Sequence, residues 1–181
     1  SHVELRDRLR MLRLTDSVTG LGTARQLPLI IQPLLRKPGH QWAMYLVDLD
    51  HFQQINAQAG HREAERLLKR VAHQLRRCCR SGDHVLRVGH DRFVAICEYL
   101  PETGAMNLAD RLLQSVRQAA GDDAAVAVHA SIGWMSSIAD AEQLGESADL
   151  WRLLEQRLRQ AKATGRDRHL GPHAPPQRQA G

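Results

Sequence analysis

The chain has 181 residues, 43% of them hydrophobic and 25% charged, and carries a formal net charge of +5 at neutral pH. We expect one soluble, cytoplasmic domain without membrane insertion, because no apolar run approaches the roughly 20 residues that span a bilayer and no signal-peptide pattern is present. The basic balance alone is compatible with nucleic-acid binding, but many arginines alternate with glutamates on predicted helices, which is typical of a solvated face, so we expect no nucleic-acid partner.

The first half of the chain predicts helices around one buried strand. Residues 1–14 are amphipathic and predict an N-terminal helix, either the end of a signalling helix or a helix packed on the domain. Residues 23–36 predict a second helix. The apolar run from Trp42 to Asp48 predicts a central strand buried on both faces. The C-terminal end of such a strand is where an open α/β sheet places a ligand.

A long amphipathic helix over residues 62–79 precedes a β-hairpin. Apolar runs at residues 83–88 and 93–98 predict its strands, and Gly89 to Arg92 predict its turn. The remaining elements are expected to be a helix over residues 102–119, a strand over residues 124–134, a last helix and a short strand at residues 168–170. This order predicts an α/β (α+β), ferredoxin-like fold whose mostly antiparallel central sheet is flanked by helices. Residues 171–181 are rich in Pro, Gln and Gly and predict a disordered tail.

The three cysteines, Cys78, Cys79 and Cys97, do not have the spacing of a zinc site. Two of them are adjacent, which also argues against a disulfide framework. We therefore expect no metal site and no disulfide from the cysteines.

The hairpin turn resembles a known family signature. Gly89-His90-Asp91-Arg92-Phe93 matches the Gly-Gly-Asp/Glu-Glu-Phe motif of the GGDEF family, diguanylate cyclase domains that condense two GTP molecules into cyclic di-GMP, at the first, third and fifth positions. Collinear similarity extends over about residues 13 to 170 and includes Asp16–Leu21, Asp48–Asn56, Ser131–Gly133 and Ala161–Asp167. The resemblance implies the nucleotidyl cyclase fold and a degenerate GGDEF domain over residues 15–170.

The resemblance also implies a metal site at the end of the central strand. Asp48, the carbonyl of Leu49 and Asp91 match the family's metal positions, with Asp91 in a residual catalytic role. Mg²⁺ prefers such oxygen ligands together with phosphate oxygens, so Mg²⁺ is the implied cofactor if GTP is bound. Residues alone leave alternatives open, because aspartate also caps helices and favours turns.

Three further residues match nucleotide contacts of the family. Asn56 corresponds to a guanine contact, and Lys162 and Arg166 correspond to residues that hold the triphosphate. The i, i+4 spacing of Lys162 and Arg166 places both on one face of a helix. The alternative is that the two cations only complement the C-terminus of that helix.

Substitutions within the motifs argue against catalysis. His90 replaces a glycine where the backbone approaches the nucleotide, which predicts a steric block. Arg92 replaces a glutamate near the metal, and its repulsion of a divalent ion ~5 Å away reaches roughly 7 kcal/mol at an effective dielectric of 20, unless the side chain points into solvent. Gln53 replaces a phosphate-directed lysine, and Arg62 stands where the family often has a guanine-binding aspartate.

A second motif precedes the hairpin. Arg80 and Asp83 form an Arg-x-x-Asp sequence at the position of the family's inhibitory site for cyclic di-GMP. An arginine fork matches guanine O6/N7 or a phosphate, and a carboxylate accepts from the N–H edge of guanine. The alternative is an ion pair at a helix end worth under about 1 kcal/mol.

Together these features predict a degenerate GGDEF domain in cyclic di-GMP signalling that is catalytically inactive, regulatory and able to bind cyclic di-GMP or GTP. The first alternative is a slow diguanylate cyclase that works as a homodimer, because each subunit presents one GTP. The second alternative is a protein-interaction scaffold that binds no nucleotide. Other signalling domains or proteins are the expected partners.

Overall fold

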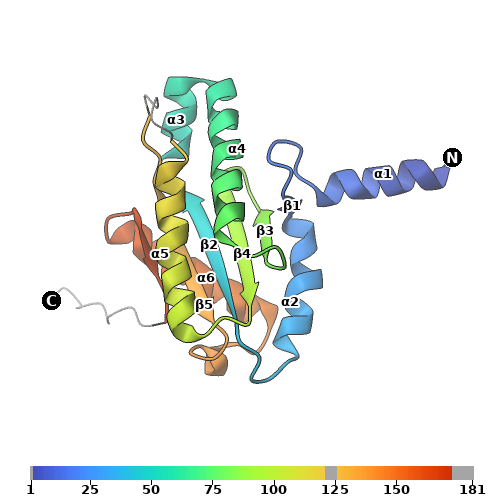
Figure 1. Cartoon of the computed structure of the whole chain (residues 1–181), viewed down its shortest axis with the longest axis vertical. Coiled ribbons are helices and arrows are strands. Elements are labelled where there is room, and N and C mark those ends of the chain that lie inside the picture. Colours follow the sequence, from blue (N-terminus) through green and yellow to red (C-terminus); the bar gives the residue numbers. More distant parts are fainter. Residues whose placement is uncertain (1, 121–125, 173–181) are drawn as a thin grey trace.

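The structure of the chain, a computed structural model, describes residues 2–120 and 126–172. Its centre is a six-stranded sheet with the order β1-β3-β4-β2-β5-β6, and helices cover both faces of this sheet (Figure 1). The strands are β1 (Gly22–Thr23), β2 (Trp42–Leu49), β3 (His84–Arg87), β4 (Arg92–Glu98), β5 (Ala130–Ser136) and β6 (Arg168–Leu170). The helices are α1 (His2–Leu14), α2 (Leu27–Leu35), α3 (Phe52–Ala59), α4 (His61–Cys78), α5 (Glu102–Gln118) and α6 (Ser147–Ala163), with short 3₁₀ helices η1 (Ala24–Gln26) and η2 (Ala141–Gln143).

Strand β2 lies in the middle of the sheet and pairs antiparallel with both β4 and β5. The hairpin strands β3 and β4 are also antiparallel. Only the two outer pairs, β1 with β3 and β5 with β6, are parallel. The predicted mostly antiparallel sheet flanked by helices is confirmed.

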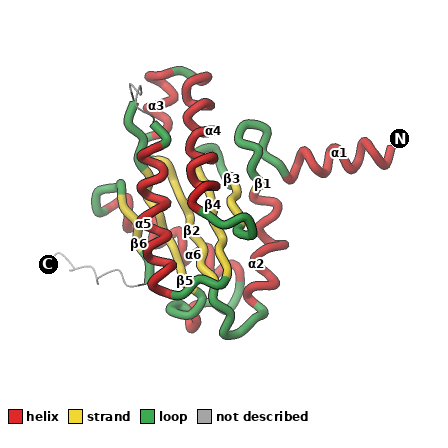
Figure 2. The backbone as a smooth tube through the Cα atoms, viewed as in Figure 1, coloured by secondary structure: helices red, strands yellow, loops and turns green. Residues whose placement is uncertain are grey.

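The buried residues of β2 alternate between two hydrophobic cores, as successive side chains of a strand must. Ala43, Tyr45, Val47 and Leu49 face the core formed with α3, α4 and α5. Their neighbours Trp42, Met44 and Leu46 face the core formed with α2 and α6. Figure 2 shows α4 and α5 side by side on one face of the sheet. Because both faces are covered, β2 is apolar along nearly its whole length.

Several predicted boundaries were wrong. The predicted helix over residues 23–36 begins only at Leu27, because Gly22 and Thr23 form the edge strand β1, which pairs with β3. The predicted strand over residues 124–134 begins at Ala130, opposite Leu49 at the end of β2, so the preceding chain has no strand to pair with. Residues 124 and 125 lie outside the described residues. The predicted turn from Gly89 to Arg92 is shifted by one residue to residues 88–91, because β3 ends at Arg87 and Arg92 is already in β4.

The two ends of the chain differ in how far the structure describes them. The predicted N-terminal helix is present as α1, which projects away from the sheet (Figure 1). Val3, Leu5 and Leu9 of α1 are exposed. The predicted disordered tail, residues 171–181, lies outside the described residues from residue 173 onward. No helix among residues 2–120 and 126–172 has the length and apolar character needed to cross a bilayer.

Candidate functional site

A polar pocket of about 270 Å³ opens at the C-terminal end of β2. The pocket is lined by Asp48, Leu49, Asp50, His51, Phe52, Gln53, Gln54, Asp91, Lys162 and Arg166. The backbone N–H of Leu49 donates to the carbonyl oxygen of Asp91 over 3.0 Å, and this bond fixes the hairpin turn beside the end of β2. The fold therefore brings together five residues that the sequence placed in one site, from three separate segments of the chain.

Asp48 is engaged by two cationic side chains. One carboxylate oxygen of Asp48, Oδ2, accepts from Lys162 Nζ at 2.8 Å and from Arg92 Nε at 3.0 Å. Arg92 in turn pairs with Glu155 on α6, with 2.5 Å between Nη1 and Oε1. The Asp48 side chain is only 7% exposed, so water screens these contacts weakly.

The strand register explains why Arg92 reaches Asp48. Asp48 and Arg92 are directly opposite each other in the antiparallel β2–β4 pair, which puts both side chains on the face covered by α6. Burial alone lowers the pKa of Arg92, but the hydrogen bond to Glu155 and the charges of Glu155 and Asp48 raise it above its ordinary value. The alternative in which Arg92 points away into solvent does not agree with this geometry.

Asp91 lies on the hairpin turn beside Asp48. Burial, and after it the negative charge of Asp48, raises the pKa of Asp91 above its ordinary value. The neighbouring His90 places its ring edge against the ring of Phe52, with the ring centroids 5.3 Å apart. His90 therefore packs on a residue that lines the pocket but is itself exposed, and the steric block stays a prediction.

Asp50 is a positioning residue that the sequence analysis did not single out. Its buried carboxylate accepts from the Ser131 hydroxyl at 2.7 Å and from the backbone N–H of Asp167 at 2.9 Å. Asp167 follows Arg166, and both adopt left-handed backbone conformations with φ of 46° and 61°. Asp50 therefore holds the loop that presents Arg166 to the pocket. The sequence feature that could have pointed to Asp50 is the second carboxylate in Asp48-Leu49-Asp50.

The remaining motif positions lie at or beyond the edge of this pocket. Gln53 lines it. Asn56 lies further along α3 and is not among the lining residues, so the structure does not group the predicted guanine contact with the others. Arg62 is exposed in the first turn of α4.

The turn that carries Asp91 is tied to the segment after α1. Arg87 of β3 donates from Nη1 to both carboxylate oxygens of Asp16 at 3.2 Å. The same guanidinium donates to the carbonyl oxygens of Gly89 at 3.1 Å and His90 at 2.6 Å. The Asp16–Leu21 motif therefore supports the geometry of the hairpin turn.

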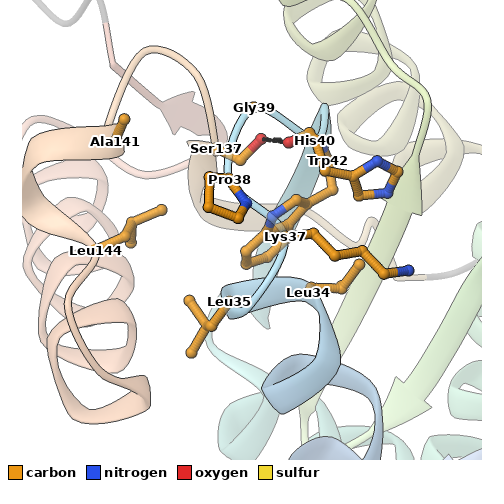
Figure 3. Close-up of a pocket in the computed structure, with 10 residues that line it drawn as sticks. All are labelled: Leu34, Leu35, Lys37, Pro38, Gly39, His40, Trp42, Ser137, Ala141 and Leu144. Atoms are coloured by element: carbon orange, nitrogen blue, oxygen red, sulfur yellow. Dashed lines mark hydrogen bonds between the residues drawn. The ribbon is translucent and has the colours of Figure 1, made fainter.

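A second pocket of about 260 Å³ lies at the other end of β2. Figure 3 shows Trp42, Leu34, Leu35 and Leu144 around it, with the Ser137 hydroxyl donating to the carbonyl oxygen of His40 at 2.7 Å. None of the predicted site residues lines this pocket, so we place no nucleotide chemistry there.

The Arg-x-x-Asp motif occupies the turn between α4 and β3. The Asp83 carboxylate accepts from the backbone N–H of Arg80 at 2.7 Å and is only 8% exposed, whereas the Arg80 side chain is 60% exposed. Arg80 also donates to the carbonyl oxygen of Glu98 at 2.9 Å. The Arg80 side chain is therefore exposed to solvent, whereas the Asp83 carboxylate is turned inward.

Next to this motif, a groove of about 550 Å³ runs between α4 and α5. Arg77 and Arg111 are among its lining residues. Arg117, the other arginine of α5, instead pairs with Asp167 at 3.0 Å. Of these two α5 arginines, Arg111 is the one that lines the groove.

The fold and the pocket define a nucleotidyl cyclase-like α/β domain. The family model described as the diguanylate cyclase GGDEF domain matches residues 13–168. This chain belongs to the GGDEF domain family, as the signature at the hairpin predicted.

Solved structures support the fold. The GGDEF domain of YfiN (TpbB) from Pseudomonas aeruginosa superimposes with a TM-score of 0.78 at 25% identity, covering 88% of this chain and 94% of that chain. The coiled coil and GGDEF domain of DgcB from Caulobacter crescentus, solved with cyclic di-GMP, gives a TM-score of 0.75 at 20% identity, covering 93% and 92%. The predicted nucleotidyl cyclase fold is confirmed.

Curated relatives are longer than this chain. Diguanylate cyclase DgcM of Escherichia coli is 32% identical over 160 residues, which cover 86% of this chain and 37% of DgcM. The cyclic di-GMP phosphodiesterase NbdA of Pseudomonas aeruginosa is 32% identical over 163 residues, covering 88% and 20%. The uncharacterized protein YhcK of Bacillus subtilis is 30% identical over 162 residues, covering 84% and 44%. The chain thus spans less than half the length of each of these relatives.

Proposed function

We propose that this chain is a catalytically inactive GGDEF domain with a regulatory role in cyclic di-GMP signalling. The observation that carries the proposal is the double pairing of Asp48 with Lys162 and Arg92. Asp48 is a metal ligand by resemblance, yet its Oδ2 atom already accepts from two cations.

The charge around the pocket disfavours a divalent ion. The oxygen donors of Asp48, Leu49 and Asp91 have the chemistry that Mg²⁺ prefers, but the Arg92 guanidinium occupies the space beside Asp48. Glu155 holds Arg92 from the other side, and the Arg92 side chain is 33% exposed, so moving it away means breaking two ion pairs. The residues as arranged do not fit Mg²⁺, and we derive no catalytic step through it.

The activity test is direct. Purified protein incubated with GTP and Mg²⁺ is expected to yield no cyclic di-GMP by chromatography. Formation of cyclic di-GMP that disappears in Asp91→Ala would contradict the proposal.

We also propose that the regulatory ligand is cyclic di-GMP and that Arg80 is its main contact. The supporting observations are the exposed Arg80 side chain and the neighbouring groove with Arg77 and Arg111, whose guanidinium groups suit guanine edges and phosphates. Contact through Asp83 requires its carboxylate to leave the backbone N–H of Arg80 and turn outward. We expect Arg111 to contribute as the α5 arginine.

Calorimetric titration with cyclic di-GMP tests this ligand. Arg80→Ala and Arg111→Ala are expected to weaken binding, whereas Arg152→Ala should leave it unchanged, because Arg152 is a surface arginine of α6 that is 74% exposed. Absence of binding by the folded wild-type chain would refute the receptor role. A thermal-shift response to neither GTP nor cyclic di-GMP would favour the protein-interaction scaffold.

A slow diguanylate cyclase is the second candidate. It is favoured by the gathering of Asp48, Asp91, Lys162 and Arg166 in one pocket. In this case Mg²⁺ and a homodimer are required, because each subunit would present one GTP. A rate of cyclic di-GMP formation that rises with the square of protein concentration at low concentration would support this candidate over the inactive domain.

A further inference from the structure

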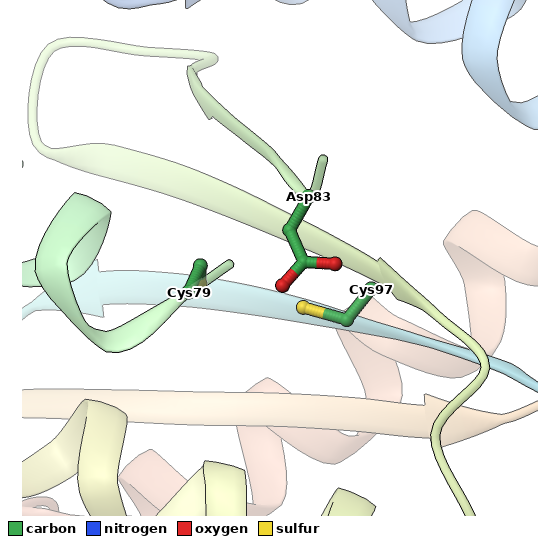
Figure 4. Close-up of side chains that lie close together, drawn as sticks. All are labelled: Cys79, Asp83 and Cys97. Carbon is green, nitrogen blue, oxygen red and sulfur yellow. The ribbon is translucent and has the colours of Figure 1, made fainter. Parts of the chain in front are cut away.

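We propose that Cys79, Asp83 and Cys97 form a binding site for one thiophilic divalent metal ion of the Zn²⁺ class. The ligand atoms of these three residues all lie within 4.8 Å of one another. Figure 4 shows the Asp83 carboxylate facing the Cys97 sulfur, with Cys79 alongside. Zn²⁺ binds sulfur at about 2.3 Å in tetrahedral geometry, which separates two sulfur ligands by about 3.8 Å, so a small movement of these side chains brings them onto one ion.

Three different elements supply the ligands, which is why the sequence spacing did not reveal the site. Cys79 is the C-cap residue of α4, Asp83 immediately precedes β3, and Cys97 lies within β4. The strand pairing of β4 with β3 brings Cys97 beside the turn that carries Asp83. The expectation that the cysteines form no metal site rested on spacing alone.

The turn that carries Asp83 is held in place by contacts outside the proposed ligand set. The backbone N–H of Asp83 donates to the carbonyl oxygen of Arg80 at 3.0 Å. Arg76 donates from Nη1 to the carbonyl oxygen of Asp83 at 2.8 Å and from Nη2 to that of Arg80. The position of the Asp83 carboxylate therefore does not depend on a metal, so the site is largely preformed.

One side of the proposed metal site is buried and the other side is partly exposed to solvent. Cys97 is fully buried and the Asp83 side chain is 8% exposed, whereas Cys79 is only partly buried. The exposed Arg80 side chain pairs with Asp83, with 3.7 Å between Arg80 Nε and Asp83 Oδ2. Three protein ligands with one reachable position leave room for a water molecule as the fourth ligand, as in open zinc sites.

The local charge also suits such an ion. Two thiolates and one carboxylate bring three negative charges, and a divalent cation leaves one of these uncompensated. The Arg76 guanidinium, which donates to the backbone carbonyl oxygen of Asp83 at 2.8 Å, adds a positive charge beside the turn that carries this ligand. Binding of the ion would displace the remaining thiol protons, because the thiolate is the ligand form of cysteine.

Cys78 provides a matched control. Its sulfur donates to the carbonyl oxygen of Arg111 over 3.6 Å, and the residue lines the groove between α4 and α5 instead of the proposed site. Cys78→Ser therefore removes one thiol from the same helix end without removing a proposed ligand. The metal proposal does not rest on the proposed cyclic di-GMP binding, although both involve Asp83.

The experiment titrates the full chain, reduced and free of metal, with Co²⁺ as a spectroscopic probe and then with Zn²⁺. We expect a thiolate-to-cobalt charge-transfer absorption that saturates at one Co²⁺ per chain and is abolished by Zn²⁺. Cys78→Ser should keep this absorption, whereas Cys79→Ser and Cys97→Ser should lose it and Asp83→Asn should weaken it. The thiolate band distinguishes the site from metal bound by histidines.

Two results would overturn the proposal. The first is the absence of the absorption in the wild-type chain, or its equal loss in Cys78→Ser and Cys79→Ser. The second is a Cys79–Cys97 disulfide, seen as a mass lower by two hydrogens, together with no cobalt binding after reduction. If Cys97→Ser fails to fold, Cys79→Ser decides the outcome, because Cys79 lies at a helix end and is only partly buried.

Discussion

Replacing Arg92 with glutamine is expected to let the pocket at the end of β2 bind a divalent ion. The substitution removes the positive charge beside Asp48 and keeps a polar side chain of similar length. Lys162 still pairs with Asp48, and Glu155 then adds an uncompensated negative charge close by. In the wild-type chain the two carboxylates are balanced by Lys162 and Arg92. The substitution should therefore leave one negative charge in excess beside the pocket.

The magnitude follows from the geometry. Arg92 Nε lies 3.0 Å from Asp48 Oδ2, and Mg²⁺ binds oxygen at about 2.1 Å, so an ion bound to Oδ2 lies at most about 5 Å from Arg92 Nε. Repulsion between a single and a double charge at that distance is about 1.7 kcal/mol in the dielectric of water and about 7 kcal/mol at an effective dielectric of 20. The lower figure already corresponds to a roughly 15-fold change in affinity.

The assay is calorimetric titration with Mn²⁺ or Mg²⁺ in the presence of a non-hydrolysable GTP analogue. We expect Arg92→Gln to bind the ion at least about 15-fold more tightly than the wild-type chain. Arg152→Gln removes the same charge from an exposed position of α6 and should change nothing. Equal affinities for the wild-type chain, Arg92→Gln and Arg152→Gln would refute the argument that Arg92 blocks the metal site.

Three stability predictions follow from other contacts, each measured by urea denaturation. Gly133→Ala should destabilise the fold by about 1–3 kcal/mol or more, because a Cβ there would lie 2.6 Å from the backbone nitrogen of Leu158 and would also clash with the carbonyl of Leu154; an unchanged midpoint would contradict this packing. Asp140→Ala should cost roughly 3–5 kcal/mol, because it leaves Arg157 without its buried partner at 2.7 Å, whereas Arg66→Ala on the exposed pair with Glu63 should cost under about 1 kcal/mol. Asp16→Asn should destabilise the fold at neutral pH. Burial raises the pKa of Asp16, but hydrogen bonds from Thr19 and Arg87 outweigh it and lower the pKa, so this stabilisation exists above the ordinary carboxyl pKa and is lost as the pH falls through the folded-state pKa. A difference between Asp16→Asn and the wild-type chain that does not shrink in acid would refute the assignment.

The elements that sequence reasoning found are those with a strong local pattern. Strand β2 could be predicted because a strand covered on both faces is apolar throughout. Strand β1 was missed because it has only two residues and exists through its pairing with β3. The start of β5 was misplaced because Val126 and Val128 alternate like a strand, although the partner strand β2 has already ended at Leu49.

The candidate site likewise contains residues that the sequence could predict and residues that it could not. The motif residues Asp48, Asp91, Lys162 and Arg166 could be assigned to one pocket because the resemblance fixed their positions. The partner of Arg92 could not be predicted, because Glu155 lies on α6, far away in the sequence, and belongs to no motif. A one-residue error in the hairpin turn also hid the register that puts Arg92 opposite Asp48.

The inward orientation of Asp83 could not be predicted either. The Arg-x-x-Asp spacing is compatible with two side chains that converge on a ligand and with an ion pair at a helix end. The structure has the ion pair, with 3.7 Å between Arg80 Nε and Asp83 Oδ2, and the backbone N–H of Arg80 donates to the same carboxylate. Cys97 lies on another strand, so the residues around Asp83 in the sequence do not show that it is nearby.

We infer that the substitutions at the hairpin turn have removed cyclase activity from a pocket that is otherwise assembled. The most direct measurement is cyclic di-GMP formation from GTP and Mg²⁺ by the wild-type chain and by the double variant His90→Gly/Arg92→Glu, with Asp91→Ala added to each as a control. We predict no product from the wild-type chain and product from the double variant that Asp91→Ala abolishes. Product from the wild-type chain that depends on Asp91 would contradict the account.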